Sequence, residues 1–194
     1  MMDLYKVGKA VCSAIFYPMF RIKVIGKENI PADGPVIISA NHISNYDPPV
    51  VGITSSRNIY FMAKEELFEK RFIGGILKRV HAFPIKRGMR DRNALRKGLD
   101  ILKEGNALGL FPEGTRQKNG EIGQGLAGAG FFALRSEAAI VPCAIIGPYR
   151  KFKPLKVVYG KPIDMTEYRE KKASAQVVTD RIMEEIRQLH KIHQ

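Results

Sequence analysis

The sequence predicts a single-domain α/β sandwich in which helices flank a mixed, mostly parallel β-sheet. The first observation is that short aliphatic runs alternate with segments whose apolar residues recur at helical spacing. The second is size, because 194 residues that are 45% hydrophobic suffice for one compact core. The third is that no repeat, low-complexity stretch or linker divides the chain. We therefore expect one globular domain over residues 21–194, preceded by a helix within residues 1–20.

Six short runs are expected to form the strands of this sheet. Most are rich in valine, isoleucine and leucine and are bounded by turn residues, which is typical of strands. Runs as apolar as 36–40 and 107–110 indicate strands that are buried on both faces, as in a parallel sheet. The expected strands are 21–25, 36–40, 59–63, 107–110, 140–146 and 156–159.

Helices are expected between these strands. The clearest spans 91–104, where Leu95, Leu99 and Leu102 recur at helical spacing and Gly105 marks the end. The other expected helices begin after Asp47 or lie at 64–70, about 73–80, 127–137, and along the C-terminal stripe of Val178, Ile182, Ile186 and Leu189.

The N-terminal segment is expected to be an amphipathic helix. Leu4, Val7, Val11 and Ile15 follow helical spacing. The unbroken apolar section 10–20 is too short for a bilayer span, which needs about twenty residues, and no convincing signal-peptide cleavage site follows it. A helix lying in the membrane interface is favoured over a helix packed on the domain's own core.

The positive net charge indicates which kinds of binding partner the protein attracts. Lysine and arginine outnumber aspartate and glutamate by 32 to 19, which gives a net charge of +13. Such a surface attracts anionic lipid, nucleic acid or phosphorylated substrates. No recognition-helix signature and no basic-aromatic strand pattern is present, so no specific nucleic-acid partner is expected.

Metal and disulfide chemistry are not expected. The two cysteines, Cys12 and Cys143, lie far apart without metal-like or disulfide-like spacing, which is consistent with a reduced compartment. No P-loop and no metal-site spacing of histidine and carboxylates occurs.

A first polar segment, Asn41-His42-Ile43-Ser44-Asn45-Tyr46-Asp47, follows the expected strand 36–40. His42 and Asp47 are near enough in sequence for a base whose second ring nitrogen is held by a carboxylate. Since no G-x-S-x-G elbow exists, the pair is expected to act on a hydroxyl of the substrate. The alternative is structural: Asp47 would cap a helix whose first residue is Pro48, and His42 would be a strand-end residue.

A second polar segment, Phe111-Pro112-Glu113-Gly114-Thr115-Arg116, follows the expected strand 107–110. A tight turn explains its proline and glycine but does not require Glu113 or Arg116. An arginine at this place can offer a planar fork to a phosphate. If the two strands are parallel neighbours, both segments meet at the carboxyl edge of the sheet, where α/β proteins bind ligands.

Four segments together resemble the glycerolipid acyltransferase family, most closely its bacterial 1-acylglycerol-3-phosphate acyltransferases. The first and third family blocks, N-H-x-x-x-x-D and F-P-E-G-T-R, are intact in the two segments above. The second is matched by Val80-His81-Ala82-Phe83-Pro84-Ile85-Lys86-Arg87 and the fourth by Ile140-Val141-Pro142-Cys143-Ala144. The blocks occur in the family's order, and the resemblance covers roughly residues 20–165.

The resemblance implies a reaction. His42 would take the proton from the free sn-2 hydroxyl of lysophosphatidic acid, and Asp47 would orient it. The hydroxyl would attack the thioester of acyl-CoA or acyl-acyl-carrier protein directly, without an acyl-enzyme and without a further cofactor, and form phosphatidic acid. The implied substrate-binding positions are Arg87, Glu113, Gly114, Thr115, Arg116 and Pro142, the last for packing or acyl binding.

The resemblance also implies a peripheral enzyme on anionic lipid at the cytoplasmic face of the cell membrane. Alternatives are acylation of glycerol-3-phosphate or another lysophospholipid, or a lipid-binding protein without turnover. One departure concerns residues 123–130, which are glycine-rich where many relatives have lysines. This stretch indicates either close backbone packing or a flexible lid.

Overall fold

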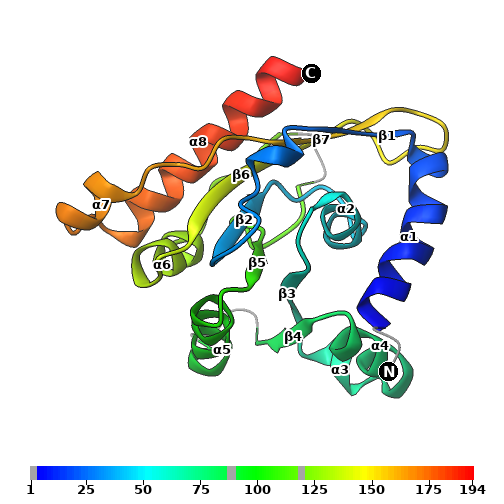
Figure 1. Cartoon of the computed structure of the whole chain (residues 1–194), viewed down its shortest axis with the longest axis horizontal. Coiled ribbons are helices and arrows are strands. Elements are labelled where there is room, and N and C mark those ends of the chain that lie inside the picture. Colours follow the sequence, from blue (N-terminus) through cyan, green and yellow to red (C-terminus); the bar gives the residue numbers. More distant parts are fainter. Residues whose placement is uncertain (1–3, 87–90, 118–120) are drawn as a thin grey trace.

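The computed structural model describes residues 4–86, 91–117 and 121–194, with the backbone alone at positions 72 and 73. The described residues form one seven-stranded sheet in the order β1-β7-β6-β2-β5-β3-β4 (Figure 1). The strands are β1 Ile22–Ile25, β2 Val36–Ala40, β3 Ile59–Lys64, β4 Ala82–Ile85, β5 Ala107–Leu110, β6 Ala139–Ile146 and β7 Leu155–Tyr159. The helices are α1 Leu4–Phe20, the 3-10 turn η1 Lys27–Asn29, α2 Asp47–Thr54, α3 Glu66–Glu69, α4 Arg71–Arg79, α5 Arg92–Lys103, α6 Gly128–Arg135, α7 Thr166–Glu170 and α8 Ala175–His193.

The sheet is mixed and mostly parallel, as predicted. Every strand pair is parallel except β6 with β7. β2 lies between β5 and β6, and Val36 pairs with Ala107 on one side and Ala139 on the other. The carboxyl ends of these three central strands therefore meet at one edge of the sheet.

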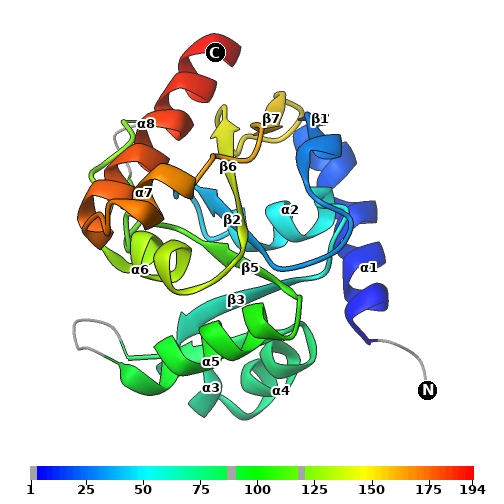
Figure 2. The same cartoon turned by 60° about the vertical axis from the view of Figure 1, so that its left-hand side comes forward.

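Two layers of helices cover the sheet because successive strand residues point to opposite faces. On one face, Val36, Ile38 and Ala40 of β2 pack in a cluster with residues of α1 and α2. On the other face, Ile37 packs in a cluster with residues of α5, α6 and α8. Figure 2 shows α6 and α8 on one side of the sheet and α1 and α2 on the other. The α/β sandwich with helices flanking the sheet, which the sequence predicts, is confirmed.

The main departure in secondary structure lies after β3. A helix was expected over 64–70, but β3 continues through Lys64 and only the short α3 is helical. The extended backbone of Lys70 (φ −73°, ψ 104°) then separates α3 from α4. The short elements η1 and α7 were not predicted, since three to five residues are too few to show a helical period.

Helix α1 packs on the domain and also presents an apolar outer face. Its inner side buries Tyr5 and Phe20, and the Tyr5 hydroxyl accepts a hydrogen bond from the Ile59 amide of β3 (2.9 Å). Its outer side exposes Leu4, Val11, Ile15 and Tyr17. The two interpretations of this helix are therefore compatible, and membrane contact stays a prediction. Within the described ranges, no helix is both long and apolar enough to cross a bilayer.

The glycine-rich stretch packs closely against α8. The Gly125 carbonyl accepts a hydrogen bond from Gln176 (2.9 Å), and a Cβ at Gly125 would lie 2.5 Å from the Thr179 methyl carbon. A Cβ at Gly130 would lie 1.9 Å from the Ala175 carbonyl oxygen. Of the two interpretations of this stretch, close backbone packing is therefore the one that the contacts support.

The contact of α6 with α8 yields a stability prediction. Gly130→Ala should lower the free energy of unfolding by about 1–3 kcal/mol, because the methyl group must push backbone apart. Gly128→Ala, two residues earlier in the same helix, should instead be neutral or stabilise by up to about 1 kcal/mol, since nothing lies within 4 Å of its Cβ position. Urea unfolding of both variants measures the difference. Equal stability of the two variants would contradict the packing described here.

Candidate functional site

The site begins where β2 ends. The side chain of Asn41, the first residue beyond β2, pairs with the backbone of Ile145 in β6: its amide donates to the carbonyl (3.0 Å) and its oxygen accepts from the N–H (2.7 Å). This two-bond clamp is fully buried and fixes the path of the chain at His42. The amide of Gln117 donates to the His42 carbonyl (2.8 Å), which ties the loop after β5 to the same point.

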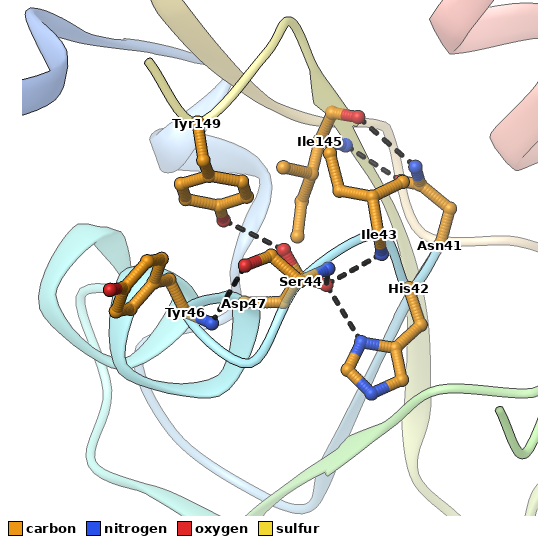
Figure 3. A network of polar contacts seen from close by, with 8 residues as sticks. All are labelled: Asn41, His42, Ile43, Ser44, Tyr46, Asp47, Ile145 and Tyr149. Atoms are coloured by element: carbon orange, nitrogen blue, oxygen red, sulfur yellow. Dashed lines mark hydrogen bonds and ion pairs between the residues drawn. The ribbon is translucent and has the colours of Figure 1, made fainter. Parts of the chain in front are cut away.

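Asp47 is the centre of the polar network in Figure 3. It is fully buried, and its Oδ2 lies 2.7 Å from His42 Nδ1. The same oxygen accepts hydrogen bonds from the amides of Ile43 and Ser44, each 2.7 Å long. Its Oδ1 accepts a hydrogen bond from the Tyr149 hydroxyl (2.7 Å). Two backbone amides and a hydroxyl thus donate to the carboxylate oxygens, in addition to the contact with the imidazole.

This arrangement sets the tautomer of His42. Oδ2 already accepts from two backbone amides, so it also accepts from His42, and Nδ1 carries the proton and donates it to Asp47. The other ring nitrogen, Nε2, then has a free lone pair and faces away from Asp47 in Figure 3. The His42 ring stacks on Phe111, with the ring centroids 4.3 Å apart, so its orientation is fixed from a second side. The predicted proximity of His42 and Asp47 is confirmed.

The alternative role of Asp47 as a helix cap is wrong. Helix α2 begins at Asp47 itself, its N-cap position is Tyr46, and no side chain caps it. The carboxylate turns back toward the residues before the helix instead of toward the amides of the first turn. Local sequence suggested a cap because Asp followed by Pro is common at helix starts, but the amides that Asp47 binds are those of the preceding loop.

Glu113 is a buried carboxyl group beside this network. Its side chain is 4% exposed, and neither oxygen has a hydrogen-bond partner of normal geometry in the described residues. The pKa of Glu113 is raised to about 7, mainly by burial and in smaller part by the nearby Asp47 charge. Hydrogen-bond donors close to the carboxyl group, first the His42 backbone, lower the pKa in part. At neutral pH the group is therefore divided between its protonated and ionised forms.

The remaining predicted positions lie in the turn after β5, within β6, or outside the described residues. Gly114 closes the turn after β5 with a bond from its amide to Phe111 (3.0 Å) and has a φ of +68°, which favours glycine. Thr115 and Arg116 follow it and are exposed at the same edge. Pro142 is buried within β6, opposite Ser39, and accepts from the Gly160 amide (2.8 Å). Arg87 lies outside the described residues.

Pro142 lies apart from the reactive groups. Its neighbours Val141 and Cys143 belong to the cluster on the α1 and α2 face, so by alternation Pro142 points to the α8 face. Its ring lies beside Gly160, next to Leu189 of α8. Of the two roles that the resemblance allowed, packing or acyl binding, this position favours packing.

Tyr149 is a residue of the site that the sequence did not predict. This residue lies 102 positions from Asp47, in the loop after β6, yet its hydroxyl contacts the carboxylate. Burial, reinforced by the Asp47 charge, raises the pKa of Tyr149 far above its ordinary value, so the hydroxyl stays protonated and donates. A parallel pairing of β6 with β2 would have placed this loop at the site, but the sequence carries no signal of strand order.

Glu113 yields a pH prediction. Its folded-state pKa of about 7 exceeds the ordinary 4.5, so between these values the folded protein binds more protons than the unfolded chain. Stability should fall as pH rises through this window, by up to about 3 kcal/mol for this group. Glu113→Gln should remove this part of the decline in urea unfolding measured from pH 4.5 to 8. Glu137→Gln, whose side chain is 90% exposed, is the control. An unchanged pH dependence in Glu113→Gln would contradict the shifted pKa.

Comparison with known proteins identifies the family. Residues 21–146 match the family model described as Acyltransferase. The 1-acyl-sn-glycerol-3-phosphate acyltransferase of Bacillus subtilis strain 168 is 34% identical over 154 residues, which cover 76% of each chain. The chloroplastic LPAT1 of Arabidopsis thaliana, which bears the same enzyme name, is 31% identical over 145 residues, or 73% of this chain and 40% of its own length.

A solved structure shows the same fold. The crystal structure of the 1-acyl-sn-glycerophosphate (LPA) acyltransferase PlsC from Thermotoga maritima aligns with a TM-score of 0.75. The alignment covers 99% of this chain and 79% of that one, at 22% sequence identity, so it supports the fold alone. Since the family match includes both segments that build the His42 site, the chain belongs to the acyltransferase family and is an enzyme of that class.

Proposed function

We propose that the protein transfers a fatty acyl group from an acyl thioester to the sn-2 hydroxyl of 1-acylglycerol-3-phosphate and so forms phosphatidic acid. The observation that carries the proposal is the His42 imidazole, whose Nδ1 is held by a buried carboxylate while Nε2 faces away from it. The names of the Bacillus and Arabidopsis relatives support the choice of acceptor.

His42 acts as the base. Its Nε2 takes the proton of the acceptor hydroxyl as the oxygen forms a bond to the thioester carbonyl carbon. The imidazolium that results is stabilised by Asp47 at 2.7 Å. When the tetrahedral intermediate collapses, the carbon–sulfur bond breaks and His42 returns the proton to the departing thiolate. The donor is acyl-CoA or acyl-acyl-carrier protein, and no further cofactor enters these steps.

Attack by the acceptor is direct because neither cysteine suits the role of nucleophile. Cys143 is fully buried in β6, and burial, reinforced by the Asp47 charge, raises the pKa of its thiol far above the ordinary value. Cys12 lies in α1, where burial also raises the thiol pKa. A thiol with a raised pKa provides little thiolate at neutral pH. An acyl-enzyme on cysteine is therefore not part of the proposal.

The turn after β5 is assigned the role of stabilising the oxyanion that forms on the thioester carbonyl oxygen. The start of α2 is the other candidate, but Pro48 and Pro49 have no N–H, and the amides of Asp47 and Val50 already bond to Ser44 and Tyr46. The amides of Ile43 and Ser44 are committed to Asp47. In the turn after β5, Pro112 has no N–H and the Gly114 amide bonds to Phe111, so the amides of Glu113, Thr115 and Arg116 are proposed to face the charge that develops on the carbonyl oxygen.

The same turn is proposed to bind the acceptor. Arg116 is exposed in this turn and would offer a planar fork to the phosphate, and Arg87, outside the described residues, is kept as a second candidate. Gly114 and Thr115 bring backbone close to the ligand. Glu113 has buried oxygens that lack a hydrogen-bond partner of normal geometry in the described chain, and a glycerol oxygen of the acceptor would supply one.

The enzyme is proposed to be peripheral and to act on an anionic membrane surface, at the cytoplasmic face. The outer face of α1 is apolar, with Leu4 at 51% and Val11 at 53% exposure. A net charge of +13 adds attraction to anionic lipid. Residues 1–20 then form the interfacial segment and residues 21–194 the acyltransferase domain.

The reaction is tested by thiol release from acyl-CoA on vesicle-presented lysophosphatidic acid. His42→Ala should lower kcat by at least about 10² to 10⁴, and Asp47→Asn by a similar factor, because the base or its tautomer is lost. His193→Ala, near the end of α8, is the control and should keep wild-type rates. Acyl-acyl-carrier protein, glycerol-3-phosphate and lysophosphatidylcholine are offered in parallel. Thiol release that depends on another acceptor would change the proposed substrate but keep the mechanism. Wild-type turnover by His42→Ala would refute the mechanism.

Tyr149 is predicted to be a positioning residue for Asp47. Tyr149→Phe keeps the ring packed against Phe20 (5.2 Å between centroids) but removes the donor to Asp47 Oδ1. The loss of one charge-assisted hydrogen bond should lower kcat about tenfold with little change in either KM.

The matched control is Tyr46→Phe, from the same aromatic cluster. Its hydroxyl does not take part in the Asp47 network of Figure 3, so kcat should stay at the wild-type value. Equal kcat values for the two variants would show that the Tyr149 hydroxyl has no positioning role.

A further inference from the structure

The loop between β6 and β7 is basic, exposed and tipped by an aromatic residue. Residues 147–154 contain Arg150, Lys151 and Lys153 and no acidic residue. All three cations are exposed, and Phe152 between them is 70% exposed. A large aromatic side chain displayed in this way gains nothing from burial within the chain itself.

The backbone holds Phe152 outward in an unfavourable conformation. Its φ is +62°, a region that costs energy for residues with a Cβ. Its amide donates to the Met19 carbonyl in the last turn of α1 (2.7 Å), and the Lys153 amide donates to the Arg150 carbonyl (3.1 Å). The loop is thus a tight, bonded structure that presents the ring to its surroundings.

The topology places this loop beside the proposed membrane helix and the active site. β6 is parallel to β2, so the loop leaves from the edge at which His42 lies. β7 starts from that edge and β1 is parallel to β7, so the carboxyl end of α1 lies there as well. Figure 1 shows the loop against the last turn of α1, at one corner of the molecule. The last turn of α1, in which Tyr17 is exposed, therefore lies beside Phe152.

We propose that the β6–β7 loop is a second lipid-contact element, which docks on an anionic bilayer surface next to α1. Phe152 enters the boundary between headgroups and acyl chains, and the three cations lie against lipid phosphates. The choice of an anionic bilayer rests on this combination: an apolar ring suits the acyl boundary, and a cluster of like charge without acidic neighbours suits phosphates. The proposal deepens the proposed function by naming which surface meets the lipid.

The proposed contact between the β6–β7 loop and the bilayer is linked to catalysis through Tyr149. Tyr149 lies three residues before Phe152 and holds Asp47, so the docked loop is the same segment that supports the catalytic pair. Docking through this loop and α1 turns the carboxyl edge of the sheet toward the bilayer. An acceptor that resides in the membrane then reaches His42 without leaving the interface.

The test measures binding separately from turnover. The full chain, wild type or variant, is sedimented with vesicles of phosphatidylcholine alone or mixed with phosphatidylglycerol. Phe152→Ser should lower partitioning onto the mixed vesicles roughly tenfold. The triple variant Arg150→Gln, Lys151→Gln, Lys153→Gln should lower it at least tenfold, since each cation contributes near an anionic surface.

Matched controls remove the same groups elsewhere. The triple variant Arg96→Gln, Lys97→Gln, Lys103→Gln loses three exposed cations of α5, and Ile192→Ser loses an apolar side chain of α8 that is 73% exposed. Both helices pack on the sheet face opposite α1. Both controls should partition like the wild type.

Activity on a monomeric, short-chain lysophosphatidic acid completes the test. The loop variants should keep wild-type rates there and lose activity only on vesicles. Wild-type partitioning of both loop variants would overturn the proposal, as would an equal loss in the α5 control. Lost partitioning in a protein that turns over no acceptor would support the lipid contact while refuting the proposed reaction.

Discussion

The buried charge of Asp47 is the constraint on which the site depends. A carboxylate without solvent exposure would cost several kcal/mol unless its oxygens were satisfied, and here four donors surround it. Two of them are backbone amides that fold the 43–47 loop into one shape. The third is the Tyr149 hydroxyl, which ties in the loop after β6. The fourth is the His42 imidazole, whose tautomer follows from the charge it faces. Removing this one charge would therefore disturb the base, the loop and the contact to Tyr149 together.

Much of this arrangement was predictable because it rests on local patterns. The strands expected at 36–40 and 107–110 occur with those bounds, since aliphatic runs between turn residues report burial directly. The pairing of His42 with Asp47 followed from a short spacing across a strand-to-helix connection, and the atoms lie 2.7 Å apart. The part that failed was also local: the Asp-Pro signal indicated a cap, but the loop amides satisfied Asp47 instead.

The rest depends on tertiary structure that a single sequence does not encode visibly. Tyr149 lies 102 positions from Asp47 and reaches it only because β6 pairs with β2. The burial of Glu113, and the pKa of about 7 that results, depend on how the turn after β5 meets His42 and Gln117. Helix α1 showed its apolar residues in sequence, but only the structure divides them into a face that packs on the core and a face that remains exposed. The structure also shows that the loop at Phe152 bonds to the end of α1, which places the exposed Phe152 next to this helix.

Catalysis by His42 requires that Asp47 fix it as the tautomer with its proton on Nδ1 and a lone pair available on Nε2. Nitrogen-15 NMR of the His42 ring, in protein labelled at histidine and held at a pH where the ring is neutral, reads the two nitrogens separately. We expect a protonated, hydrogen-bonded Nδ1 and an unprotonated Nε2, with this preference lost in Asp47→Asn. A proton found on Nε2 in the wild-type protein, or an unchanged spectrum in the variant, would contradict it.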